Sequence, residues 1–423
     1  MHVVIITDFA EVNGGAAKVA IASARGIAER GVRVTYLHAM PAVDDSLRHP
    51  NITPVCLGLT NVWDEQPRKA ALQAVWNCEA ERRISAILKR FDRGDTVVHF
   101  HQWTKALSPS AIRAVGRAGF HHVITMHDYA LACPNGAYFN YPNNAPCNLE
   151  PMSLACMTTQ CDVRGWAHKL VRVARQLSSN AAIGRAGSLL NVVHVTPFSA
   201  AIAGAFLPCG IRQRVVGNPI ITTRTAAVDV RRNKHFVYLG RFTKEKGAAL
   251  LACAASEGGY SAAFMGGGYD EGAIRKANPS ARVFGWGATP DVDSFFATAR
   301  CLVFPSLWYE CHGLVVAEAL SRGIPVIVSR ATAARDLIQD GLTGLVVDPR
   351  SKSDLLRCLD TLADDALVEA MGRNAYEMYW RNPPSVDSHV DGILRIYQEI
   401  LRSSLGVTEA RLGLRKPSRA SSS

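Results

Sequence analysis

The chain has 423 residues, of which 48% are hydrophobic and 20% charged, and its formal net charge is +11. This length fits two domains of roughly 200 residues each, and the composition excludes a largely disordered protein. No apolar run approaches the ~20 residues that a membrane-spanning helix needs.

Short β-rich runs, apolar on both faces, alternate with helical patterns in the first half of the chain. Residues 1–6 have the pattern of a buried strand and lack the features of a signal peptide, so we expect a cytoplasmic protein. Repeated βα units of this kind predict a doubly wound parallel sheet. The predicted strands are Val3–Thr7, Val32–Leu37, Thr96–Phe100, Val123–Met126 and Val192–Thr196, and the predicted helices include Ala16–Arg30 and Lys69–Phe91.

The same alternation restarts after the turn dipeptide Asn218-Pro219. We therefore expect two facing α/β domains, residues 1–217 and 218–380, with ligands bound between them at the carboxyl ends of the strands. A final helix at about 386–402 is expected to pack back on the first domain, and the basic tail 403–423 to be disordered. The predicted strands of the second sheet are His235–Leu239, Ala262–Met265, Ala281–Phe284, Cys301–Phe304, Pro325–Val328 and Gly344–Val347.

The most informative stretch is residues 307–320, LWYECHGLVVAEAL, which follows a predicted strand and opens a helix at Gly313. A glycine lets the backbone approach a ligand closely, and a helix start directs free N–H groups and a positive dipole end toward it. Glu310 precedes this helix and Glu318 lies in its second turn, so both carboxylates can face one ligand. The alternative is a pair of solvent-facing glutamates, although the neighbours of Glu318 are apolar.

Glu310 and Glu318, with seven residues between them, resemble the E-x7-E signature of the retaining glycosyltransferases of family 4, which have the GT-B fold. Several ordered motifs together are stronger support than one. The resemblance implies two facing Rossmann-like domains and transfer of a sugar from a nucleotide diphosphate sugar to a saccharide, with retention. The other similar motifs are Gly240–Gly247, Gly266-Gly267-Gly268, Pro305-Ser306, Gly323-Ile324-Pro325 and Gly341–Gly344, and the glycine-rich first loop Asn13–Ala16.

The resemblance also implies how the donor is held at its diphosphate. Arg241 and Lys246 would bind the diphosphate and stabilise the charge that develops on it as it leaves; the alternative is a solvated basic pair on a surface loop. Because these two cations can do the electrostatic work of a divalent ion, we expect no cofactor in the chemistry. Backbone N–H groups toward the phosphates and the sugar would come from Gly14, Gly15, Gly313 and Leu314.

The remaining implied contacts concern the sugar, the ribose and the base. Glu318 would bind the ribose hydroxyls, and Glu310 would contact the donor sugar. His127 follows a predicted strand and would lie beside that sugar, while Trp286 would lie near the base. Family members often carry an aromatic residue where His312 stands, so the resemblance does not define the donor-sugar contacts of this chain.

The acceptor implied by the resemblance is a saccharide hydroxyl on a lipid-linked glycan of the cell surface. His99 and His101, at another strand end, are candidates for the acceptor side. No nucleic acid partner is expected. The alternatives are a sugar-nucleotide epimerase with the same two-domain plan and a catalytically silent GT-B partner subunit. A dehydrogenase fits less well, since no strict G-x-G-x-x-G follows the first strand.

Four of the 11 cysteines lie in a loop-like segment of the first domain, at about 133–161. Four thiolates can hold zinc or an iron–sulfur cluster, which would order such a loop. The resemblance extends to this insertion, because exopolysaccharide and capsule-type members carry a similar one. No spacing is the short Cys-x2-Cys pair, so a structural metal and free thiols remain alternatives. The four are Cys133, Cys147, Cys156 and Cys161.

Positive charge gathers in two segments, residues 163–190 with five basic residues and no acid, and 402–423 with five against Glu409. The segment Trp166–Leu190 has the pattern of an interfacial helix, which predicts docking on the anionic inner face of the cytoplasmic membrane. The alternative is a stripe packed on the domain core with solvated charges. The apolar positions are Trp166, Leu170, Val173 and Leu177, and the basic ones are Lys169, Arg172 and Arg175.

Overall fold

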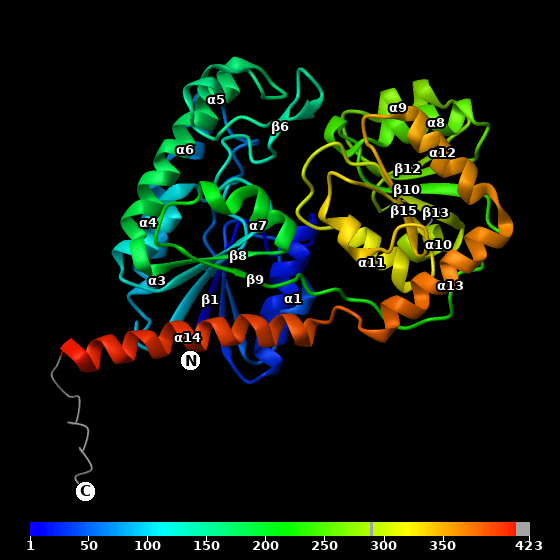
Figure 1. The fold of residues 1–423 in the computed structure, drawn as a ribbon. Coiled ribbons are helices and arrows are strands. Elements are labelled where there is room, and N and C mark those ends of the chain that lie inside the picture. The colour runs from blue at the N-terminus through cyan, green and yellow to red at the C-terminus, as the bar shows by residue number, and fades with distance from the viewer. Residues whose placement is uncertain (288–290, 412–423) are drawn as a thin grey trace, which may run out of the picture.

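The computed structural model describes residues 1–287 and 291–411, which form two α/β domains joined side by side (Figure 1). Of the predicted basic tail, residues 412–423 lie outside the described residues. The final helix α14 (Val386–Arg411) extends beyond residue 402, where the sequence pattern led us to end it.

The first domain is built on a seven-stranded sheet with the order β3-β2-β1-β4-β5-β8-β9, in which every strand pair is parallel. Its order reverses direction at β1, as in a doubly wound sheet. The strands are β1 (His2–Thr7), β2 (Arg33–His38), β3 (Ile52–Cys56), β4 (Thr96–Phe100), β5 (His122–Met126), β8 (Leu190–His194) and β9 (Arg212–Val215).

The second domain repeats this plan with a six-stranded parallel sheet of order β12-β11-β10-β13-β14-β15. The strands are β10 (His235–Arg241), β11 (Ala262–Gly267), β12 (Arg282–Phe284), β13 (Ala299–Phe304), β14 (Val326–Ser329) and β15 (Gly344–Val347). The predicted fold class, two doubly wound parallel sheets, is confirmed.

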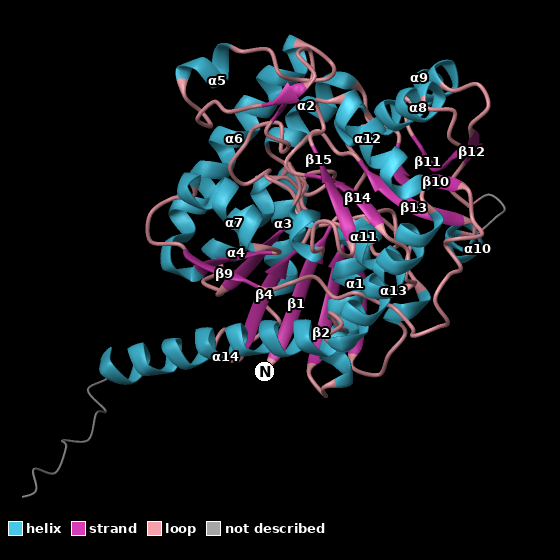
Figure 2. Cartoon of the chain, turned by 45° about the vertical axis from the view of Figure 1, so that its right-hand side comes forward, coloured by secondary structure: helices cyan, strands magenta, loops and turns pink. Residues whose placement is uncertain are grey.

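Helices cover both faces of each sheet, and Figure 2 shows them around the strands. In the first domain they are α1 (Gly15–Glu29), α2 (Pro67–Val75), α3 (Cys78–Leu88), α4 (Pro109–Arg117), α5 (Leu154–Thr158), α6 (Trp166–Ala186) and α7 (Pro197–Ala203). In the second they are α8 (Ala248–Glu257), α9 (Glu271–Ala277), α10 (Val292–Ala297), α11 (Leu314–Ser321), α12 (Lys352–Ala363) and α13 (Asp365–Arg381).

The strands of the first sheet are apolar on both faces because each face has its own core. Val3 and Ile5 pack in one cluster with α1 and α14, whereas Val4 and Ile6 pack in the other with α3 and α4. Successive side chains of a strand point to opposite faces, so one buried strand serves both clusters. This alternation is what made the central strands predictable.

The helix predicted over Lys69–Phe91 is instead two helices, α2 and α3. The break falls at Asn77, whose buried side chain caps α3 by accepting hydrogen bonds from Glu79 N and Ala80 N. An asparagine at this position satisfies backbone donors that a continuous helix would satisfy itself.

Helix α14 lies along the first domain, although it follows the second in the sequence (Figure 1). Val390, Ile393 and Tyr397 are buried in the same cluster as α1. His389 Nδ1 donates to the carbonyl oxygen of Gly217 at 2.7 Å, next to the chain segment that leaves the first sheet.

The segment predicted to meet a membrane forms α6, but its basic residues do not face solvent as expected. Lys169 is 0% exposed. Arg172 donates to the carbonyl oxygen of Asn135 and Arg175 to that of Pro134, at 2.7 and 2.9 Å. These cations hold the adjoining loop because its carbonyl groups have no strand partner. The apolar positions Trp166, Leu170 and Leu177 are exposed instead. Across residues 1–287 and 291–411, no helix is long and apolar enough to cross a bilayer.

Candidate functional site

The loop between β13 and α11, in the second domain, contacts the first domain. Trp308 is buried, and its ring lies edge-on to that of Tyr129 of the first domain, with centroids 6.5 Å apart. Thr196 Oγ1, at the start of α7, donates to the carbonyl oxygen of Cys311 at 2.9 Å. The motif at residues 307–320 of the second domain therefore contacts the first domain at two points.

Two helix N-termini meet at this junction. Helix α1 begins at Gly15 and α11 at Leu314, and a Cβ added to Gly15 would lie 3.1 Å from Leu314 Cδ1. A Cβ at Gly313 would lie 2.6 Å from Ala334 Cβ, so this position has room only for glycine. The structure thus brings together the predicted backbone donors Gly14, Gly15, Gly313 and Leu314. Free N–H groups at two facing helix starts form a favourable environment for an anion.

Glu318 reaches across the junction to the first domain. Its Oε1 pairs with Lys18 Nζ of α1 at 2.7 Å, and the two side chains are 17% and 38% exposed. Sequence reasoning did not identify Lys18. Lys18 could have been found from its position, because it lies in the first turn of the helix that follows the glycine-rich loop. The pair gives the junction one cation and one carboxylate beside the helix termini.

Glu310 and Lys246, which the sequence assigned separate tasks, form an ion pair. Trp308 Nε1 donates to the same carboxylate oxygen, Glu310 Oε2, at 2.8 Å. The Lys246 ammonium lies 4.9 Å from the centre of the Trp308 ring. Both charged side chains are mostly buried, so their mutual attraction is screened less than that of a surface pair.

Arg241 ends β10 and is 62% exposed, with Glu245 Oε1 4.0 Å from its guanidinium. A short 3-10 turn follows, and Gly247 closes it with φ of 72°. A Cβ at Gly247 would lie 2.3 Å from the carbonyl oxygen of Pro305. Only glycine fits that conformation and that contact. The turn therefore packs closely against the end of β13, and this contact positions Arg241 and Lys246 near the junction.

His127 follows β5 directly, as predicted from the strand pattern. Its Nε2 lies 3.0 Å from Nδ1 of His101, the residue that follows the neighbouring strand β4, and the two rings stack. Burial, and then repulsion from the protonated forms of His389 and His312, lower the pKa of His127 to about 3. His127 is therefore neutral near pH 7 and carries no positive charge into the site.

His312, the residue that departs from the family pattern, is mostly buried. Burial lowers its pKa to about 4, although the nearby Glu310 carboxylate opposes this shift. It too is uncharged near pH 7.

Trp286 follows β12 at the far end of the predicted site and is 57% exposed. Its Cδ1 lies 3.5 Å from where a Cβ of Gly267 would be, at the end of β11. A Cβ there would make only an ordinary van der Waals contact, so the indole ring lies against the end of β11. An exposed aromatic face at the carboxyl edge of a sheet can stack on a planar ligand group.

We call residues 133–161 the cysteine insertion. Its four cysteines are all free of disulfide bonds. Among the described residues, no group of three or more His, Cys, Asp or Glu side chains is arranged to hold a metal ion. The four-thiolate site predicted at Cys133, Cys147, Cys156 and Cys161 therefore has no geometric support. The insertion instead packs on the first domain, with Phe139 fully buried in its core.

Comparison with known proteins agrees with this architecture. Residues 224–378 match the family model described as "Glycosyl transferases group 1". Sucrose-phosphate synthase from Thermosynechococcus elongatus is similar over 95% of this chain and 99% of its own, with a TM-score of 0.70 and 16% identity. HepE from Anabaena in complex with UDP is similar over 94% of this chain and 100% of its own, with a TM-score of 0.62 and 16% identity. The predicted GT-B fold is thereby confirmed.

Curated relatives match shorter stretches. O-antigen chain mannosyltransferase B from Escherichia coli is 34% identical over 106 residues, which are 24% of this chain and 27% of that protein. The matches to these curated relatives cover between 19% and 48% of the relatives' own lengths.

Proposed function

We propose that this protein is a glycosyltransferase that moves a sugar from a nucleotide diphosphate sugar to a saccharide hydroxyl, with retention of anomeric configuration. The observation that carries the proposal is the meeting of two helix N-termini with the pairs Lys18–Glu318 and Lys246–Glu310 at the junction of a GT-B fold. The match of residues 224–378 to "Glycosyl transferases group 1" and the UDP complex of HepE support it.

In this proposal, the diphosphate lies at the facing helix starts, within reach of Arg241 and Lys246. As the bond from the anomeric carbon to the diphosphate breaks, negative charge grows on the leaving group. Preorganised cations and N–H groups stabilise that charge more than they stabilise the bound donor, which lowers the barrier. Because this charge comes from the protein, the proposed chemistry needs no divalent metal.

The other residues hold the donor. Glu318 accepts hydrogen bonds from the ribose, for which the ribose hydroxyls displace Lys18, and the exposed Trp286 ring stacks on the base. Glu310 and the neutral His127 contact the transferred sugar from the second and first domains. We include retention of configuration in the proposal because the E-x7-E spacing of Glu310 and Glu318 resembles that of retaining enzymes.

A sugar-nucleotide epimerase is the competing enzyme, and a silent GT-B subunit the competing non-enzyme. Product analysis without acceptor tests for the epimerase, because an epimerase changes the configuration at one carbon of the donor sugar, whereas a transferase leaves the configuration of the donor sugar unchanged. A silent subunit gives neither product nor hydrolysis.

Donor binding is tested by thermal shift against a panel of nucleotide diphosphate sugars. A ligand of the folded state raises the unfolding temperature by mass action. We expect one or more donors to shift the wild type, and Glu318→Ala to need at least about tenfold more donor for the same shift, the equivalent of a charged hydrogen bond. Glu377→Ala, an exposed glutamate of α13, is the control and should match the wild type. An equal response of both variants would contradict the role of Glu318.

We further propose that the acceptor is lipid-linked and that the protein docks on the inner face of the cytoplasmic membrane through α6. The support is a set of exposed apolar side chains on α6 and on α2, which packs against it. Exposed cations of α2 would meet anionic headgroups, in place of the buried Lys169. The apolar residues are Leu72, Trp166, Leu170 and Leu177, and the cations are Arg68 and Lys69.

Liposome co-sedimentation tests the docking surface. Inserting three large apolar side chains stabilises the bound state by several kcal/mol, so Trp166, Leu170 and Leu177 changed together to Ser should lower the bound fraction at least about tenfold. Leu342→Ser removes a comparably exposed leucine from the second domain and should leave binding unchanged. Equal sedimentation of the triple variant and the wild type would rule out this surface.

A further inference from the structure

Two cations of the first domain are held over the ring of Trp63, and we call these three residues the Trp63 cluster. The Lys105 ammonium lies 5.3 Å from the centre of that ring, and the central carbon of the Arg164 guanidinium lies 3.9 Å from it. Positive charge is attracted to the face of an indole ring, which gathers both cations at one place. Val62 N donates to the carbonyl oxygen of Lys105 at 2.8 Å, so the segment before α2 is bonded to the loop after β4. Trp63 is 47% exposed, so the cluster is open to a ligand.

Buried aspartates fix the backbone beneath both cations. Asp8, which follows β1 and is 0% exposed, accepts hydrogen bonds from the backbone N–H groups of residues 105–107. Asp162, which is 1% exposed, accepts one from Arg164 N at 2.8 Å. The cluster is therefore built on a well-ordered backbone, although its side chains come from separate segments.

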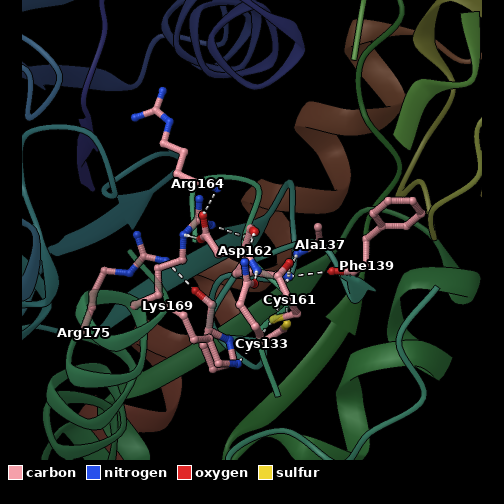
Figure 3. A network of polar contacts seen from close by, with 12 residues as sticks. Cys133, Ala137, Phe139, Cys161, Asp162, Arg164, Lys169 and Arg175 are labelled. Atoms are coloured by element: carbon pink, nitrogen blue, oxygen red, sulfur yellow. Dashed lines mark hydrogen bonds and ion pairs between the residues drawn. The ribbon is translucent and has the colours of Figure 1, made fainter. Parts of the chain in front are cut away.

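The carboxylates that fix the backbone do not pair with these two cations. In the part of the chain that the structure describes, neither Lys105 nor Arg164 forms an ion pair or donates a side-chain hydrogen bond. Figure 3 shows the Arg164 side chain extending away from the buried contacts around Asp162 and Cys161. Like charges held over one ring repel each other, and a bound anion would offset that repulsion.

The cluster lies at the edge of the first sheet where a ligand is expected. Trp63 follows β3, Lys105 follows β4, and Arg164 lies just beyond the cysteine insertion, which follows β5. All three therefore belong to connections that leave the carboxyl ends of parallel strands. Ligands of doubly wound sheets bind outside those ends.

The electrostatic surroundings of Lys105 place it near the proposed donor position. Burial lowers the pKa of Lys105, and the carboxylates of Asp8 and Asp128 oppose this shift. The cations Arg172 and Arg241 lower the pKa further. Because Arg241 belongs to the second domain, the Lys105 ammonium lies within electrostatic reach of the junction. An anion bound there would lie beside the donor.

We propose that the Trp63 cluster binds an anionic group of the saccharide acceptor, a carboxylate or a phosphate, and so selects acidic glycans as substrates. The Lys105 ammonium and the Arg164 guanidinium donate charge-assisted hydrogen bonds to the anion. A neutral saccharide lacks this contact and leaves both cations without a counter-charge. The assignment of the ligand to the acceptor rests on the proposed transferase activity, whereas the binding site itself does not.

Fluorine NMR of the full-length protein labelled with fluorotryptophan tests the binding site without turnover. The chain has 7 tryptophans, and the resonance lost in Trp63→Phe identifies Trp63. We expect glucose 6-phosphate or glucuronic acid to shift that resonance, and methyl glucoside, which is uncharged, to leave it unchanged. The anion that acts at the lower concentration distinguishes a phosphate from a carboxylate.

Removal of either cation should raise the concentration of that anion needed for half of the shift by at least about tenfold, the equivalent of one charged hydrogen bond. The variants are Lys105→Gln and Arg164→Gln. The matched control is Arg185→Gln, an exposed arginine near the far end of α6, which should behave as the wild type. The thermal shift produced by nucleotide sugar should be unchanged in Arg164→Gln, because donor binding does not use that residue.

A Trp63 resonance that neither anionic sugar shifts would overturn the proposal, and so would an equal shift with methyl glucoside. Inorganic phosphate that binds as tightly as glucose 6-phosphate would indicate an adventitious anion site only, and would overturn the acceptor assignment. If Arg164→Gln lowers binding to anionic liposomes but leaves the sugar titration unchanged, this cation belongs to the membrane surface and the proposal is wrong. If the anionic sugar binds as expected but no donor gives transfer, the binding site is supported and the proposed transferase activity is contradicted.

Discussion

Lys246→Ala and Arg241→Ala should each lower turnover at saturating nucleotide sugar by at least about a hundredfold, comparable to the loss of one preorganised oxyanion donor. Each change removes a cation from the proposed diphosphate position. Lys246→Ala also leaves Glu310 without its partner, and a mostly buried carboxylate next to the leaving group opposes the growth of negative charge there. The measurement is the initial rate of sugar transfer under donor saturation.

The matched control is Lys244→Ala, because Lys244 lies in the same turn and its side chain is exposed. Its turnover should remain within about threefold of the wild type, as for most exposed substitutions. Near wild-type turnover in both Arg241→Ala and Lys246→Ala would refute the diphosphate assignment. A comparable loss in Lys244→Ala would indicate a general effect of positive charge on the loop.

The free energy of unfolding should fall steeply as the pH drops below about 6.5, the ordinary pKa of histidine. Burial lowers the pKa of His99 to about 3 and those of His122 and His389 to about 4. Between these values and about 6.5, the unfolded chain binds protons at these positions and the folded chain does not. Each histidine then removes about 1.4 kcal/mol of stability per pH unit, and the three together about 4 kcal/mol.

Over the roughly 2.5 pH units between about 6.5 and about 4 that loss amounts to about 10 kcal/mol, which is comparable to the whole stability of an ordinary domain, about 5–15 kcal/mol. Urea denaturation at about pH 7.5, 6.5 and 5.5 measures it. His122→Phe, beside the ring of Phe100, removes one titrating group and should reduce the slope by about 1.4 kcal/mol per pH unit. A free energy of unfolding that stays constant from about pH 7 to pH 5 would contradict the prediction.

The central strands could be predicted from the sequence, whereas the edges of the first sheet could not. Strands such as β1 and β4 are apolar on both faces because helices cover both, and this pattern is visible in the letters. The edge strand β9 is exposed along its whole length, and β3 is mostly exposed and contains Pro54. Their pairing depends on the neighbouring strand, β8 or β2, and leaves little hydrophobic signal.

In the site, positions at strand ends and helix starts were predictable, but pairs between the domains were not. The strand pattern and the family resemblance pointed to His127, Glu310 and Glu318. Lys18 was missed because its partner lies 300 residues away. Lys169 was assigned to a membrane surface, since helical spacing separates an apolar face from a charged one without showing which face is buried. In α6 the cations contact the cysteine insertion, so the charged face of this helix is the buried one.

The return of α14 to the first domain means that two chain segments pass between the domains. One follows β9 and the other joins α13 to α14. Because His389 of α14 bonds the carbonyl oxygen of Gly217, the two crossings are tied together at one point. Any rotation of one domain relative to the other would then pivot near that point, whereas two independent tethers would allow more freedom. Lys18–Glu318 joins the two facing surfaces in this structure. Each turnover would have to break and remake that pair.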